Sequence, residues 1–83
     1  MMPWFALIWE WDEEDGNVAH IAEHGVSPED VEDVFEHPIR YERSRSSGRP
    51  IVFGYTNDGR RIAVVYEQLD DGSLYPVTAY EVE

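Results

Sequence analysis

The chain has 83 residues, a formal net charge of -12 and no cysteine. A chain of this length buries roughly 60–65% of its extended surface, so we expect a single domain over residues 1–83 with a modest core. The lack of cysteine excludes a disulfide framework and a thiolate metal site, and it favours a reducing, cytoplasmic setting. The apolar N-terminal run soon meets Glu10 and Asp12, so we expect neither a membrane span nor a signal peptide.

The charges are unevenly distributed along the chain. All six cations are arginines that lie between residues 40 and 61, where only Glu42 and Asp58 oppose them. The rest of the chain carries acids and neither lysine nor arginine. We therefore expect one locally basic face or edge on a molecule that otherwise repels polyanions. The alternative is an acid-rich surface that maintains solubility, with the arginines gathered by chance.

The first two predicted elements are a strand and a helix. Residues 5–11 form a short apolar and aromatic run that is typical of a strand. Asp12 then suits an N-cap, and apolar residues recur at helical spacing, which predicts a helix over residues 13–24. Gly16 inside this helix costs about 1 kcal/mol relative to alanine, so the helix depends on packing more than on propensity.

A tight corner should join this helix to a second one. Gly25 suits the left-handed position that ends a helix. Ser27 can cap the next helix by accepting a hydrogen bond from the Asp30 amide, and Pro28 suits the first helical position. Pro38 cannot continue the helix, so the second helix should end before it.

From residue 39 the apolar pattern changes to alternation, which is typical of strands. Turn signals at residues 46–48, 57–59 and 70–73 predict strands over residues 39–45, 50–56, 61–68 and 74–81. Pro76 cannot donate to a ladder, so the last strand should be an edge strand or be bulged there. We assign Ile51, Phe53 and Tyr55 to the face of Ile62, Val64 and Tyr66, and Val52, Gly54 and Thr56 to the face of Ala63, Val65 and Glu67.

The order of these elements is β-α-α-β-β-β-β. This order predicts an α+β fold in which two helices pack on one face of a five-stranded, mainly antiparallel sheet. Such a sheet would leave its second face exposed to water.

Two sets of residues match a family pattern. The more specific set comprises Trp11-Asp12, Asn17, His20, His24-Gly25-Val26-Ser27, Glu29, Val34-Phe35 and Pro38. The looser set comprises Gly59-Arg60, the run from Ile62 to Tyr66 with Glu67, the Asp71-Gly72 turn and Val77-Thr78-Ala79. Together they resemble BrnT-type toxins, the small ribonuclease-like partners of type II toxin–antitoxin modules.

The resemblance implies a RelE-like fold, which agrees with the element order above. It also implies a cognate antitoxin of the ribbon-helix-helix type that binds promoter DNA, and assembly as a toxin–antitoxin hetero-oligomer; a homodimer remains open. One departure concerns Tyr80, which stands where family members usually carry an arginine followed by a basic segment.

RNA cleavage by such a fold needs cations to hold the phosphate and an acid or base to move the 2'-hydroxyl proton. Arg60 or Arg61 with Glu67 would supply this set, His20 and His24 would join it from the first helix, and Tyr80 would donate a hydrogen bond or stack on a base. We therefore expect a toxin with a weak or altered metal-independent ribonuclease site that binds RNA. The alternative is a non-catalytic interaction module that retains the fold.

Four arginines form a candidate partner-binding set. Guanidinium groups bind carboxylates and phosphates bidentately, so these side chains would clamp a partner. The alternative is that they are solvated and guard an exposed strand edge. The four residues are Arg40, Arg43, Arg45 and Arg49.

A zinc-dependent hydrolase is a third hypothesis. His20 and His24 match the H-x-x-E-H pattern of inverted zinc peptidases and would lie on one side of a helix. Such an enzyme needs a third ligand and a cleft that a chain of this length can scarcely form. We therefore expect no metal and no cofactor, with one histidine at the helix end, where its charge complements the helix dipole, and its neighbour packed or hydrogen-bonded near the sheet.

Overall fold

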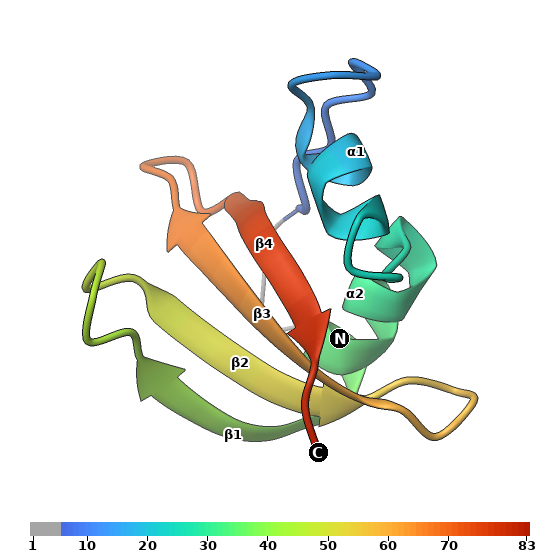
Figure 1. The fold of residues 1–83 in the computed structure, drawn as a ribbon. Helices are drawn as coiled ribbons and strands as arrows, with labels where there is room; N and C mark the ends of the chain where they lie inside the picture. Colours follow the sequence, from blue (N-terminus) through green and yellow to red (C-terminus); the bar gives the residue numbers. More distant parts are fainter. Residues whose placement is uncertain (1–5) are drawn as a thin grey trace.

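The computed structural model describes residues 6–83, in which two short helices lie against one face of a four-stranded antiparallel sheet (Figure 1). The strands follow one another across the sheet in chain order. The expected α+β class is confirmed. The elements are α1 (Asn17–Ala22), α2 (Pro28–Glu36), β1 (Pro38–Arg43), β2 (Pro50–Tyr55), β3 (Arg61–Gln68) and β4 (Leu74–Glu81).

The expected fifth strand at residues 5–11 is wrong for the part that the structure describes, and Phe5 lies outside the described residues. This segment makes a single parallel bridge, between Leu7 and Leu74. Backbone hydrogen bonds of 2.8 and 2.9 Å join Leu74 to Ala6 and Ile8. The bridge does not extend into a ladder, because Pro76, two residues further along β4, has no amide to donate.

The side chain of Asn17 takes the place of a strand partner for this segment. It is buried, its Oδ1 accepts from the Glu10 amide at 2.8 Å, and its Nδ2 donates to the Ile8 carbonyl at 3.0 Å. The same Nδ2 donates to the Pro76 carbonyl at 2.9 Å. One amide group therefore ties the N-terminal segment and α1 to β4.

Helix α1 is shorter than the predicted helix over residues 13–24. The side chain of Asp12 accepts hydrogen bonds from the amides of Glu14 and Asp15, both at 2.9 Å, and so forms a turn. Gly16 is the N-cap of α1, and a Cβ on it would overlap the Glu10 carbonyl oxygen. The chain crosses its own N-terminal segment at this glycine, so the helix begins only after it.

The predicted corner between the helices is confirmed. Gly25 has a φ of 76°, which is the left-handed conformation that glycine adopts most readily. The Asp30 amide donates to Ser27 Oγ at 3.2 Å, and the Ser27 amide donates to Asp30 Oδ2 at 3.0 Å. This reciprocal capping box fixes the start of α2, with Pro28 as its first residue.

The core lies between α2 and the middle of the sheet. Gly54 of β2 allows the close approach, since a Cβ there would lie 2.9 Å from the carbonyl oxygens of Val34 and His37. The residues buried in this core include Ile21, Val31, Val34, Phe35, Val52, Ile62, Val64, Tyr66 and Ala79.

The predicted assignment of residues to the two faces of the sheet is wrong across strands. Val52 pairs with Val64, and Phe53 pairs with Ala63, so Val52 and Gly54 share the helix-covered face with Val64. A strand with apolar residues on both faces does not reveal by alternation which face is covered. The prediction for Pro76 is confirmed, because β4 is the last strand of the sheet and its register with β3 shifts beside this residue.

Candidate functional site

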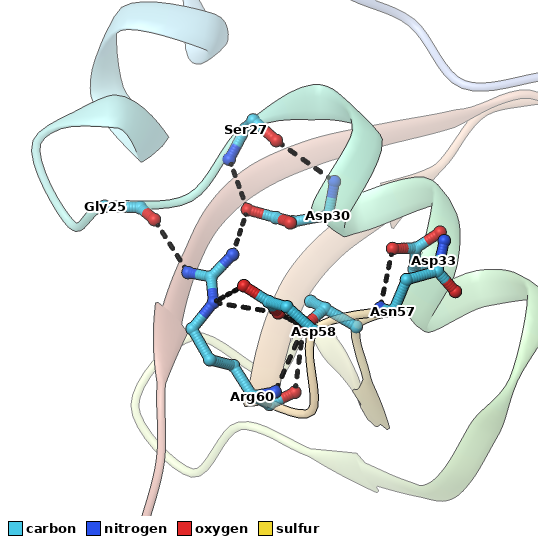
Figure 2. A network of polar contacts seen from close by, with 8 residues as sticks. Gly25, Ser27, Asp30, Asp33, Asn57, Asp58 and Arg60 are labelled. Carbon is cyan, nitrogen blue, oxygen red and sulfur yellow. Dashed lines mark hydrogen bonds and ion pairs between the residues drawn. The ribbon is translucent and has the colours of Figure 1, made fainter.

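Arg60 is held where the β2–β3 turn meets the corner between the helices. Its Nη1 donates to the Gly25 carbonyl at 3.0 Å, and its Nη2 donates to Asp30 Oδ2 at 2.7 Å (Figure 2). Its Nε lies 3.2 and 3.1 Å from the two carboxylate oxygens of Asp58. The guanidinium thus joins the cap of α2 to the hairpin, and little of it is free to hold a phosphate.

The electrostatics of this contact agree with its geometry. Hydrogen bonds to Asp30 and then Asp58 raise the pKa of Arg60 above its ordinary value. The pKa of Asp58 is lowered, first by a hydrogen bond from the Thr56 hydroxyl and then by Arg60. The Asn57 amide donates to Asp33 Oδ2 at 3.0 Å, which anchors the same turn to α2 a second time (Figure 2).

The sheet face that points away from the helices is called the open face below. The register places Arg40, Phe53, Ala63 and Tyr80 in one row across this face, and Glu42, Ile51 and Val65 in the next. Arg40 lies over the Phe53 ring, with Cζ 4.6 Å from the ring centroid, and its Nε is 2.7 Å from Glu42 Oε2. The open face is therefore apolar in its centre and carries paired charges at its margin.

Glu67 lies on the open face, but its partner is neither of the predicted arginines. Arg49 contacts its Oε1 with Nε at 2.8 Å and with Nη2 at 2.7 Å. Arg61 is six residues away on β3, which corresponds to about 20 Å along a strand. Glu67 and Arg61 are too far apart at this separation to act on the same phosphate.

Arg61 and two tyrosines form a cluster at the other end of the open face. Arg61 pairs with Tyr55 across strands, and Tyr80 pairs with Ala63, the next residue of β3 on this face. Tyr55 is 50% exposed and Tyr80 is 37% exposed. The Nε of Arg61 is buried and has no hydrogen-bond partner within residues 6–83. Tyr55, Arg61 and Tyr80 are called the Arg61 cluster below.

The histidines lie apart from both groups, on α1 and the corner after it. His20 Nε2 is 3.0 Å from Thr78 Oγ1, and the rings of His20 and His24 meet edge to face with centroids 5.5 Å apart. No group of three histidine, cysteine or acidic side chains able to hold a metal occurs in the part of the chain described here. The H-x-x-E-H pattern therefore lacks a third ligand.

The four arginines of the predicted partner-binding set do not form one clamp. Arg40 and Arg49 reach the open face and are paired with glutamates. Arg43 donates to the Gly48 carbonyl at 2.6 Å, and Arg45 is exposed in the β1–β2 turn. The alternative reading, solvated residues along a strand edge, describes Arg43 and Arg45 better.

The six predicted catalytic residues thus lie in four different places. Arg60 contacts the corner between the helices, and the two histidines lie on the α1 side of the sheet. Glu67 lies at one end of the open face, and Arg61 and Tyr80 lie at the other. No family model, curated protein or solved structure matches this chain. Among residues 6–83, no helix is long and apolar enough to cross a membrane.

Sequence reasoning missed two residues that shape the open face. The pattern predicts Phe53 on the face of Ile62 and Val64, but it lies under Arg40 on the open face. The pattern predicts Tyr55 on the face of Ile62 and Tyr66, but it lies half exposed beside Arg61. Gly54 between them was the available signal, because a glycine in a strand often marks the place where another backbone approaches closely.

Proposed function

We propose that this chain is a BrnT-like protein with a RelE-like fold, the toxin-type component of a cytoplasmic toxin–antitoxin module, and that it acts by binding its partner rather than by efficient RNA cleavage. The observation that carries this proposal is the position of Arg60. Its guanidinium is engaged by Asp30, Asp58 and the Gly25 carbonyl, away from Glu67. An α+β fold in which Arg60 and Glu67 pair with other residues supports a binding role over efficient cleavage.

The open face supplies the binding surface. Aromatic residues and arginine are enriched in protein interfaces, and this face offers Phe53, Tyr55 and Tyr80 with Arg40 and Arg61. An RNA strand on the same face would meet two glutamates on a chain of net charge -12. A protein partner with mixed charges can pair with both signs, which favours the expected ribbon-helix-helix antitoxin.

Calorimetric titration with the product of the adjacent reading frame tests this function. We expect saturable binding that Tyr55→Ala weakens about tenfold, because tyrosine is enriched among the few residues that supply most of the binding energy of an interface. Glu32→Ala, an exposed site on α2, is the matched control and should bind as the wild type does. Absence of binding, or equal affinity of Tyr55→Ala and the wild type, would contradict the proposal.

A residual ribonuclease site is the second candidate, and the Arg61 cluster favours it. Arg61 carries a buried Nε without a partner in the described part of the chain, and two tyrosines that can stack on bases flank it. Induced expression tests this candidate in cells. Growth arrest that Arg61→Ala abolishes and Arg45→Ala retains would support it, whereas growth unaffected by the wild-type protein would exclude it.

A further inference from the structure

Strand β1 forms a free edge of the sheet. Within residues 6–83 it pairs only with β2, and all six of its residues are exposed. The opposite edge, β4, is partly covered by the bridge from Leu7. Figure 1 shows β1 at the outer margin of the sheet, on the side away from α1. An exposed edge of this kind is a ready template for another strand.

The backbone groups that point outward from β1 can be identified. The Ser44 amide donates to the Arg49 carbonyl at 2.7 Å, and hydrogen-bonded pairs alternate along an antiparallel ladder. Glu42 and Arg40 therefore bond toward β2, while Tyr41 and Arg43 direct their amides and carbonyls outward. Pro50 lies opposite Arg43 and has no amide, which agrees with this alternation.

We propose that β1 pairs antiparallel with β1 of a second copy of this chain, about a two-fold axis at Tyr41, so that two four-stranded sheets become continuous. The backbones of the two Tyr41 residues then exchange two hydrogen bonds, because their outward groups face each other. Arg43 of each copy lies opposite Ile39 of the other, where the register of β1 with β2 shifts between Pro38 and Arg40, so the pairing is regular at Tyr41 and irregular at its ends. The surface patch is the same on both copies, as a two-fold interface requires.

The charges along β1 select this register. With Tyr41 at the axis, Arg40 of each copy lies opposite Glu42 of the other, which gives two equivalent Arg40–Glu42 contacts. These two side chains lie 2.7 Å apart within one copy, so both project from the same face of β1 and meet their counterparts on the same face of the new ladder. An axis at Arg40 or Glu42 would place like charges directly opposite, which destabilises a sheet. An axis between residues would oppose outward and inward backbone groups, so the ladder excludes it.

Two features limit the strength of this association. Each copy carries a net charge of -12, so the copies repel each other at long range. A single six-residue strand buries less than the roughly 1,000 Å² of a stable complex. We therefore expect a weak dimer with a dissociation constant of about 100 µM. This inference does not depend on the proposed toxin–antitoxin function.

Sedimentation equilibrium of the full chain and two charge variants tests the proposal. Wild type should dimerise, whereas Arg40→Glu and Glu42→Arg should each associate at least about tenfold more weakly, because like charges then face across the ladder. An equimolar mixture of the two variants should recover a dimer of nearly wild-type affinity. Neither variant contains the internal Arg40–Glu42 ion pair, so recovery reports only the contact between copies.

Arg45→Glu is the matched control, because it changes the charge as Arg40→Glu does at an exposed turn residue outside β1. It should dimerise as the wild type does. Amide exchange adds a second readout: protection of Tyr41 should rise with protein concentration, while that of Arg40 and Glu42 should not. A wild-type monomer at about 1 mM, a mixture that stays monomeric, or unchanged exchange at Tyr41 would each overturn the proposal.

Discussion

Replacing Arg60 with alanine tests whether this residue stabilises the fold. The change removes the hydrogen bond to the Gly25 carbonyl and the ion pair with Asp30. In that ion pair the Arg60 side chain is 29% exposed and the Asp30 side chain is 16% exposed. Hydrogen bonds to charged groups contribute about 1.5–3 kcal/mol, and exposure to solvent reduces this value. We therefore expect the free energy of unfolding to fall by about 2 kcal/mol, which lowers the melting temperature by about 8–16 °C in a domain of this size.

Urea unfolding followed by circular dichroism measures this change, with Arg45→Ala as the control. The control removes an exposed arginine of the β1–β2 turn and should shift the free energy by less than about 0.5 kcal/mol. A double-mutant cycle with Asp30→Ala should give a coupling energy of about 1 kcal/mol, because the two side chains contact each other directly. If Arg60→Ala melts within about 2 °C of the wild type, the structural role assigned to Arg60 is refuted.

Three further changes test the fold and its pH dependence. Gly54→Ala should lower the free energy of unfolding by about 1–3 kcal/mol, because the added Cβ would press on the backbone of α2. Gly48→Ala has open space around it and should cost about 1 kcal/mol, because its φ is positive. Thermal melts compare the two variants. Asn17→Ala leaves the buried Pro76 carbonyl, and the partly buried Ile8 carbonyl and Glu10 amide, without this partner and should cost about 1–3 kcal/mol, measured by urea unfolding. Folding lowers the pKa of Asp58 below its ordinary 3.8. The ionised side chain therefore contributes fully to the free energy of unfolding above that pH, and this contribution is lost as the pH falls through the folded pKa. Between about pH 6 and pH 3 the urea midpoint of Asp58→Asn should fall less than that of the wild type, and an equal fall would contradict this assignment.

The helical corner was predictable because its signals are local. Gly25, Ser27 and Pro28 each act within three or four residues of their own position, and each adopts the conformation that its chemistry favours. The N-terminal strand failed for the opposite reason. Asn17 bonds to Pro76, 59 residues away, and no local pattern shows that a side chain will take the place of a strand partner.

The candidate site was less predictable than the fold because its charges pair at long range. Arg60 pairs with Asp30, which is 30 residues away in the sequence, and Arg49 pairs with Glu67, which is 18 residues away. A sequence with six arginines and 18 acids allows many such pairings, and only the register of the strands selects among them. The choice of the sheet face that α2 covers agrees with Gly54, whose role in the approach of α2 becomes clear only when both elements are placed together.

The most direct test of the central claim is the single-turnover rate of RNA cleavage by the purified full chain, compared with its Arg61→Ala and Glu67→Ala variants. Because Arg60 is engaged elsewhere and Glu67 is paired with Arg49, we predict that wild type and both variants cleave at the same background rate. A wild-type rate at least about a hundredfold above that of either folded variant, the range expected for one positioned acid–base group, would contradict the account.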